Sequence, residues 1–240
     1  MNNNIKAILF DSGRVLNGPV TGSWSISPNF YKYINKKMFN SLFLKNKNNA
    51  MKKAWRYINS QTLIATEEQE YKHFINFFEI LSSELPELEL TKEKVELLAK
   101  DFVYNYDKYK FYDDVFEIIP DLSKYYKLAV ISDAWPSLEN VFRQANLRNY
   151  FSSFIISSKK GVTKPNELMY KYALEELGVK PEEAVFIDDN PKNCDGASKL
   201  GIKTVLLNRG KLLLLRNKVI IRSKHKVIRN LNDLVNLLNE

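Results

Sequence analysis

The sequence predicts an α/β fold in which a parallel β-sheet is flanked by helices and interrupted once by an inserted helical module. Short apolar runs rich in Ile, Val and Leu alternate with amphipathic stretches, which is typical of a parallel sheet covered on both faces. More than a hundred residues without such a run separate the first predicted strand from the second. With 240 residues, of which 45% are hydrophobic and 27% charged, the chain can form one large domain that carries an insertion.

Five apolar runs are predicted as strands of the sheet, because they lack the polar alternation of a half-exposed strand. They cover residues 5–10, 128–131, 154–156, 184–187 and 204–207. Between them, Pro136 lies at the start of a helical stretch, and a second stretch runs from Asn166 to Leu177 and ends at Gly178. This alternation predicts the core at residues 1–17 and 112–240.

The inserted module is predicted at residues 18–111 and consists of helices. Thr66 begins a helical segment, and residues 50–64 and 91–103 have similar apolar stripes. The aromatic residues of the first segment are expected to form the core of a helical bundle: Tyr71, Phe74, Phe77 and Phe78. Residues 17–24 are rich in turn formers and suit either a hinge or a plain surface loop.

The net charge of +8 is concentrated near the C-terminus. Residues 196–232 contain ten basic and no acidic side chains, so the rest of the chain has a net charge of −2. Within this stretch, residues 218–222 alternate in the manner of an edge strand. We interpret the stretch as a solvated surface that attracts anions, and a nucleic-acid partner is not expected.

The remaining composition excludes several classes of protein. No run reaches the roughly 18 apolar residues of a membrane-spanning helix, and no membrane partner is expected. The first residues lack the features of a signal peptide, which favours a cytoplasmic location. The single cysteine, Cys194, cannot form an internal disulfide and is expected to be structural. Oligomeric state is left open.

Polar residues follow four of the predicted strands, where open α/β sheets build their ligand sites. Asp11 follows the first strand, and Ser132 with Asp133 follows the second. Lys164 stands before a proline and a helix, and the pair Asp188-Asp189 follows the fourth strand. Each segment alone reads as an ordinary turn or helix cap. Together, the four segments favour a single site.

The chemistry of this set indicates a metal-dependent phosphoryl site. Asp188 and Asp189 near Asp11 would repel one another unless a divalent cation lay among them, and carboxylate oxygens suit Mg²⁺. Asp11 is then a candidate nucleophile towards a phosphoryl group. Ser132 and Lys164 would hold the phosphoryl oxygens, one by a hydrogen bond and the other by its charge.

This order of Asp, Ser, Lys-Pro and Asp-Asp resembles the haloacid dehalogenase (HAD) superfamily, and the resemblance covers nearly the whole chain. It implies a Rossmann-like core, a helical cap of the C1 type and membership of subfamily IA. It also implies a phosphatase that uses Mg²⁺ and acts on a small phosphorylated metabolite. By this resemblance Asp11 and Lys164 are catalytic, and Asn193 orients the metal loop. The implied metal ligands are Asp11, the carbonyl of Gly13, Asp188 and Asp189, and the implied phosphate-binding residues are Ser12, Gly13, Ser132 and Lys164.

Two residues depart from the phosphatase pattern and keep two alternatives open. Gly13 stands where the phosphatases usually have an Asp that protonates the leaving group, and Arg14 or a cap residue is a candidate replacement. Asp133 stands where the family often has Asn, and we expect it to be paired with a basic group of the substrate or cap. The alternatives are a 2-haloacid dehalogenase, which needs no metal, and a catalytically weak HAD protein with a binding role.

Overall fold

The computed structural model describes residues 4–210 and 224–239. By their internal contacts these residues form two compact units. One unit takes in the described residues of Met1–Gly18, Lys110–Ala134 and Phe142–Glu240, and the other takes in Pro19–Tyr109 and Trp135–Val141. From the sequence, all of residues 112–240 were assigned to the core, whereas the contacts group Trp135–Val141 with the helical unit.

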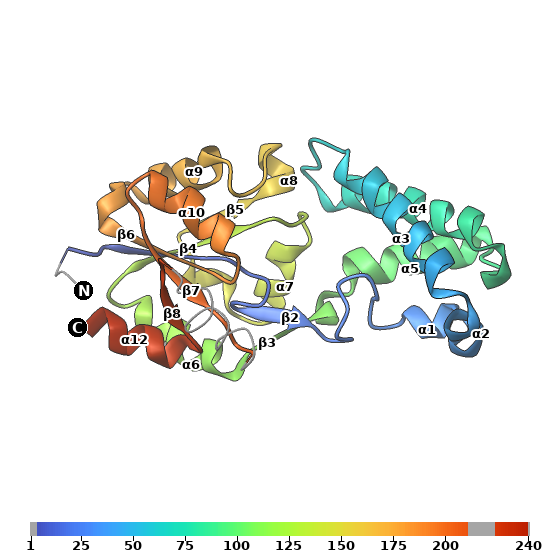
Figure 1. The fold of residues 1–240 in the computed structure, drawn as a ribbon, viewed down its shortest axis with the longest axis horizontal. Coiled ribbons are helices and arrows are strands. Elements are labelled where there is room, and N and C mark those ends of the chain that lie inside the picture. The colour runs from blue at the N-terminus through green and yellow to red at the C-terminus, as the bar shows by residue number, and fades with distance from the viewer. Residues whose placement is uncertain (1–3, 211–223, 240) are drawn as a thin grey trace. The chain divides into compact units, whose positions relative to one another are not determined.

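The first unit is built on a parallel sheet of six strands (Figure 1). In spatial order the strands are β5 (Ser153–Ile156), β4 (Lys127–Ser132), β1 (Ala7–Phe10), β6 (Ala184–Asp188), β7 (Lys203–Leu207) and β8 (Lys226–Ile228). Every pairing is parallel. All side chains of β1 and β6 are buried, which explains the uninterrupted apolar sequences of β1 and of residues 184–187 in β6. The predicted α/β fold class is confirmed.

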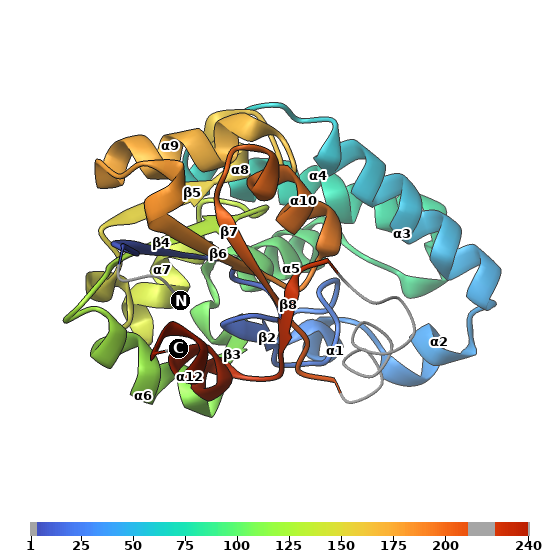
Figure 2. The same ribbon diagram turned by 60° about the vertical axis from the view of Figure 1, so that its left-hand side comes forward.

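Helices cover both faces of this sheet (Figure 1 and Figure 2). One face packs against α9 (Glu167–Leu177) and α10 (Pro191–Lys199), and α8 (Ser157–Lys160) lies on the same side. The other face holds α6 (Asp113–Leu122) and α12 (Leu231–Asn239). The predicted end of α9 is confirmed, because Gly178 follows it with a φ of 62°, in the left-handed region that favours glycine.

The second unit is helical, as the sequence predicts. Thr66 and Thr91 each accept a hydrogen bond from a backbone N–H in the first turn of the helix that follows, and so fix where α4 and α5 begin. The rings of Phe74 and Phe102 stack in the core with centroids 4.2 Å apart. The helices are α1 (Phe30–Tyr33), α2 (Lys36–Ser41), α3 (Leu44–Asn59), α4 (Glu67–Glu84) and α5 (Lys92–Tyr104), with 3₁₀ turns η1 (Pro86–Leu88) and η2 (Tyr106–Lys108).

A buried polar network ties Trp135–Val141 into the helical unit. The backbone N–H and the hydroxyl of Ser137 donate to the carboxylate of Glu70 at 2.8 and 2.6 Å, and Lys108 donates to the Ser137 hydroxyl at 2.7 Å. Burial raises the pKa of Glu70, although Lys108 and Ser137 oppose that shift. Burial likewise lowers the pKa of Lys108. The two charged groups are therefore held in the interior by each other and by one serine.

Several short elements connect these parts. The chain passes between the units at β2 (Asn17–Pro19) and β3 (Tyr109–Phe111), which pair with each other. Further along the chain lie α7 (Leu138–Gln144), η3 (Arg148–Tyr150) and η4 (Pro181–Glu183). The edge strand predicted at residues 218–222 lies outside the described residues, and β8 is an edge strand that the sequence did not indicate. Within residues 4–210 and 224–239, no helix is both long and apolar enough to cross a membrane.

Candidate active site

The polar residues singled out in the sequence come together at the carboxyl ends of the central strands. Phe10 pairs with Val130 of β4 on one side and with Ile187 of β6 on the other. Asp11 and Asp188 therefore leave neighbouring strands at the same level, and Ser132 ends β4 beside them. Ser12, Asp11, Ser132 and Asp188 are all buried. Parallel pairing of three strands is what brings residues so distant in sequence to one edge of the sheet.

Lys164 lies between two of these carboxylates. Its Nζ atom donates to Asp11 Oδ1 at 2.6 Å and to Asp188 Oδ2 at 2.8 Å, and its side chain is 2% exposed. Burial disfavours the charged ammonium, but Asp11, Asp188 and Asp133 outweigh it and raise the pKa of Lys164. The lysine is therefore a fixed positive charge at the floor of the site. The peptide bond between Lys164 and Pro165 is cis.

Three carboxylates at the site lie close enough to share a cation. Asp11, Asp188 and Asp189 each offer an oxygen, and these oxygens all lie within 4.8 Å of one another. Burial raises the pKa of Asp11 to about 8, with Asp188 and Asp189 adding to the shift and Lys164 opposing it. Burial and the charge of Asp188 also raise the pKa of Asp189, against the effect of Arg14. A divalent cation would relieve this repulsion, and oxygen donors suit Mg²⁺. The residues present therefore fit the implied metal.

Asp188 is held in place by its own loop and by the start of α10. The backbone N–H of Asn190 donates to Asp188 Oδ1 at 2.7 Å, and Asn193 Nδ2 donates to Asp188 Oδ2 at 3.0 Å. The hydroxyl of Tyr170 donates to the carbonyl of Asn193 at 2.8 Å. Asn193 thus contacts the residue that the resemblance implies it orients, and Tyr170 supports it from α9, which the sequence did not indicate.

The loop after Asp11 is closed by hydrogen bonds that Asn17 makes to Ser12. Asn17 donates from its side chain to Ser12 Oγ at 2.8 Å and from its backbone to the Ser12 carbonyl at 3.1 Å. Between them, Arg14 has a φ of 61°, a conformation that is uncommon for a residue with a side chain. Its guanidinium lies 3.4 Å from Asp189 Oδ2, so this candidate for the missing general acid contacts the proposed metal site.

Arg209, which the sequence did not indicate as a site residue, holds the loop after Asp11 by hydrogen bonds to its backbone. Its Nε and Nη2 atoms both donate to the carbonyl of Val15, at 3.1 and 2.8 Å. The guanidinium also forms a two-fold hydrogen-bonded pair with Asp114 and lies 3.8 Å from the centroid of the Tyr112 ring. A planar fork suits this pairing and a lysine would not reproduce it. The only sequence signal is a basic residue two positions after a strand.

Two expectations about single residues have different outcomes. Asp133 contacts the backbone at Lys164. Its Oδ1 atom accepts the backbone N–H of Lys164 at 2.9 Å, so it is a turn-stabilising carboxylate, and burial raises its pKa despite the nearby Lys164 charge. The expected pairing of Asp133 with a basic group of the substrate or cap stays a prediction. Cys194 is buried and free, and burial raises the pKa of its thiol, as expected for a structural cysteine.

Comparison with known proteins gives one family, and both phosphatases and a dehalogenase are among the named relatives. A family model described as haloacid dehalogenase-like hydrolase matches residues 34–207. A phosphoserine phosphatase of Thermus thermophilus is 31% identical over 121 residues, which are 49% of each chain. A glyceraldehyde 3-phosphate phosphatase of Methanopyrus kandleri is 33% identical over 45% of this chain and 49% of that one. An (S)-2-haloacid dehalogenase of Burkholderia cepacia is 29% identical over 43% of this chain and 46% of that one.

Solved structures extend the likeness in fold to the whole chain. A 2-haloacid dehalogenase from Pseudomonas syringae superposes with a TM-score of 0.69 at 16% identity and covers 98% of both chains. A putative HAD-hydrolase of Bacillus subtilis, solved bound to magnesium, superposes with a TM-score of 0.64 at 16% identity over 99% of this chain and all of the other. At such identities the fold alone is shared. The chain spans about half the length of the curated relatives that it matches.

Proposed function

Since the chain belongs to the haloacid dehalogenase-like hydrolase family, and is therefore a hydrolase, we propose that it is a Mg²⁺-dependent phosphatase of a small phosphomonoester. The observation that carries this proposal is the cluster of Asp11, Asp188 and Asp189, whose oxygens lie within 4.8 Å of one another beside the buried Lys164. The phosphatases among the relatives support a phosphate ester as substrate. Their names do not identify the alcohol.

Four groups of this chain would hold the metal: the carboxylates of Asp11, Asp188 and Asp189 and the backbone carbonyl of Gly13. Bound Mg²⁺ would neutralise phosphoryl charge and lower the repulsion that a carboxylate nucleophile meets. Asn193 and the N–H of Asn190 keep Asp188 turned towards the cluster. Arg14 is a neighbour of this site through Asp189 and not one of its ligands.

Asp11 is the proposed nucleophile. Among the described residues, only its Oδ1 atom accepts a side-chain hydrogen bond, from Lys164, which leaves Oδ2 to attack phosphorus. The new bond joins this oxygen to phosphorus while the ester P–O bond breaks. The alcohol leaves with its electron pair and takes a proton from water. Water then attacks the aspartyl-phosphate, which releases inorganic phosphate and restores the carboxylate.

The positive charge for this transfer comes from Lys164, and Ser132 with the backbone amides of Ser12 and Gly13 would hold the remaining phosphoryl oxygens. Such fixed donors stabilise charge that builds up in the transition state. No carboxyl group stands at Gly13 to protonate the leaving alcohol, and this absence should cost about 10²- to 10⁴-fold unless the alcohol is acidic. We therefore expect a preference for substrates with good leaving groups.

A 2-haloacid dehalogenase is the second candidate. Gly13 favours it, because a carbon–halogen bond needs no proton on its leaving group, and a haloacid dehalogenase is among the relatives. Against it stands the cluster of Asp11, Asp188 and Asp189. Lys164 and Arg14 offset its negative charge only in part, since the pKa values of Asp11 and Asp189 stay raised beside them. Activity that survives EDTA on a halogenated acid would select this candidate.

The test is release of inorganic phosphate from p-nitrophenyl phosphate and a panel of phosphometabolites, with Mg²⁺ and with EDTA. We expect metal-dependent release by the wild type and none by Asp11→Asn. Asp121→Asn is the matched control, since that carboxylate lies on α6, is exposed and pairs with the exposed Lys124. Circular dichroism checks that both variants fold. Undiminished release by Asp11→Asn would refute the covalent mechanism, and no release from any ester would refute the phosphatase.

A further inference from the structure

The first half of the helical unit has an unusual distribution of charge. Between Asp11 and Glu67 the chain contains no acidic residue, whereas nine are basic. Eight of these nine belong to the segment from α1 to α3, at Lys32, Lys36, Lys37, Lys45, Lys47, Lys52, Lys53 and Arg56. Residues 60–109 of the same unit contain eleven acidic and five basic residues. The positive charge of this unit is therefore collected on α1–α3.

Most of these basic side chains are not neutralised within the structure. Lys53 pairs with Glu84, Lys47 donates to the carbonyl of Phe39, and Lys36 lies over the ring of Tyr31. Among residues 4–210 and 224–239, no ion pair involves Lys32, Lys37, Lys45, Lys52 or Arg56, and all five are exposed. Their charges are available to a partner.

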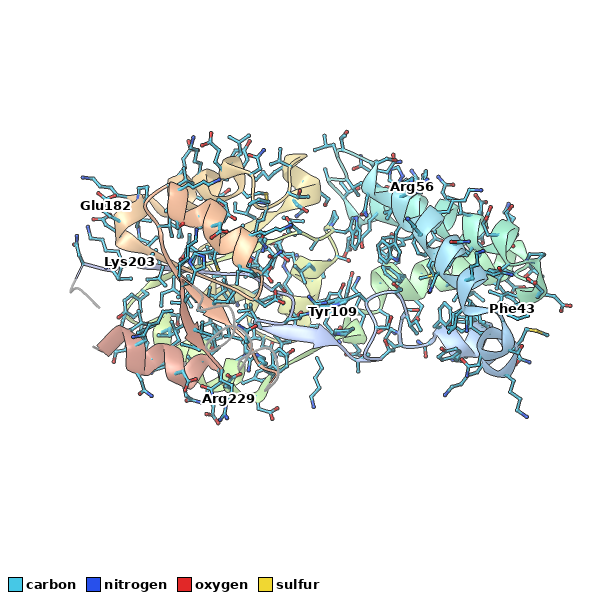
Figure 3. The ribbon with its side chains drawn as sticks, viewed as in Figure 1. Phe43, Arg56, Tyr109, Glu182, Lys203 and Arg229 are labelled. Carbon is cyan, nitrogen blue, oxygen red and sulfur yellow. The ribbon has the colours of Figure 1, made fainter. Side chains whose placement is uncertain are left out.

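Four apolar side chains are exposed on the same helices. Phe43 and Leu44 are consecutive and are 80% and 72% exposed, while Met38 and Tyr31 are 42% and 37% exposed. Phe43 lies between α2 and α3 (Figure 3) and directly precedes the first residue of α3. We call Tyr31, Met38, Phe43 and Leu44 the apolar tip. Two adjacent large apolar residues at such exposure are costly in water unless they are covered.

We propose that the apolar tip and the surrounding lysines bind the surface of a bilayer that contains anionic phospholipids. Lys36, Lys37 and Lys45 lie within eight positions of Phe43 in sequence, so the charges would reach the headgroups while the tip enters the boundary with the acyl chains. A nucleic acid could neutralise the lysines, but Met38 and Leu44 have no ring on which a base can stack. A bilayer satisfies both the charged and the apolar part of the surface.

This proposal does not depend on the phosphatase activity and replaces the expectation that the chain has no membrane partner. It concerns binding on the surface and not a membrane span. Each lysine near an anionic surface contributes about a fivefold factor in partitioning, so the three lysines together should contribute roughly a hundredfold. Both the charged and the apolar contributions are measurable on the full chain.

The experiment is flotation of the full-length protein with vesicles of phosphatidylcholine alone or with added phosphatidylserine. We expect binding to the anionic vesicles only, falling with salt. The triple variant Lys36→Gln, Lys37→Gln, Lys45→Gln should reduce partitioning by roughly a hundredfold, and the matched control is Lys92→Gln, Lys94→Gln, Lys100→Gln on α5.

The apolar contribution is tested by Phe43→Ser with Leu44→Ser, which should abolish most of the remaining binding. Leu63→Ser is its control, because Leu63 is also 61% exposed but lies outside the apolar tip. All these positions are at the surface, so the variants should fold, which circular dichroism checks. Equal binding to both kinds of vesicle, no binding, or binding to RNA in the absence of vesicle binding would overturn the proposal.

Discussion

Replacing Lys164 with methionine should destabilise the protein and remove its nucleophile together. The Nζ atom lies 2.6 Å from Asp11 and 2.8 Å from Asp188, and the three side chains are 2%, 11% and 0% exposed. Removing one partner of a buried ion pair typically costs about 3–5 kcal/mol, because the remaining charge is left without compensation. Burial already raises the pKa of Asp11 to about 8 in the presence of the lysine. Lys164 opposes that shift, so without the lysine the pKa of Asp11 should rise further, and the carboxylate that attacks phosphorus should form only at a higher pH.

The assay is chemical denaturation of wild type and Lys164→Met in EDTA and in Mg²⁺, followed by turnover with p-nitrophenyl phosphate. We expect a loss of about 3–5 kcal/mol in EDTA, partial recovery in Mg²⁺, and at least about a 10³-fold loss of turnover. Lys124→Met is the control, since its pair with Asp121 is exposed on both sides and should be worth less than about 1 kcal/mol. A Lys164→Met protein within about 1 kcal/mol of wild type in EDTA would refute this reasoning.

Three further predictions concern the surroundings of the site and the helical unit. Burial raises the pKa of Glu70 above its ordinary 4.5, so the folded protein keeps that proton to higher pH than the unfolded chain. In denaturation curves, the free energy of unfolding of wild type relative to Glu70→Gln should therefore fall as pH rises above 4.5. Gly196→Ala would place a Cβ atom 2.7 Å from Cβ and 2.8 Å from the carbonyl oxygen of Pro165, so denaturation should show a loss of about 1–3 kcal/mol. Arg209→Met removes both donors to the Val15 carbonyl, and calorimetry should show Mg²⁺ binding weakened by about tenfold or more.

Each of these three has a matched control and a contrary outcome. Glu68→Gln is the control for the first prediction, because Glu68 lies on the same helix and is exposed. If the stability of Glu70→Gln relative to wild type fell with rising pH, that prediction would be contradicted. Ser198→Ala is the control for the second prediction, because it adds no side-chain atom to α10. A Gly196→Ala protein as stable as wild type would contradict that prediction. Arg229→Met removes a nearby exposed charge, and unchanged Mg²⁺ affinity in Arg209→Met would contradict the third.

The fold and the members of the candidate site were predictable because their signals are local. Asp11 and Asp188 each end an uninterrupted apolar run, and parallel strands carry such residues to one edge. Lys164 and Asp11 are 153 positions apart. The motifs predicted that both belong to one site, but not that they form a hydrogen bond. Arg209 reaches Val15 across 194 positions. No sequence pattern near Arg209 predicts that contact, because the contact depends on where two loops meet after folding.

β8 and the partner of Asp133 were missed for a related reason. β8 has only three residues and one buried side chain, so its sequence gives almost no apolar periodicity. Asp133 is expected to pair with a basic group of the substrate or cap, and the sequence did not indicate that the backbone N–H of Lys164 also donates to it. Backbone donors carry no sequence signature, and a reading of side-chain charges alone overlooks them.

The grouping of Trp135–Val141 with the helical unit changes how this protein can be taken apart. The chain crosses between the two units four times, after Gly18, Tyr109, Ala134 and Val141. A cap excised at the first two crossings would contain Glu70 and Lys108 but not the serine that bridges them. A chimera that exchanges caps between relatives must therefore transplant two discontinuous segments. The exchangeable module of this enzyme is larger than the insertion visible in its sequence.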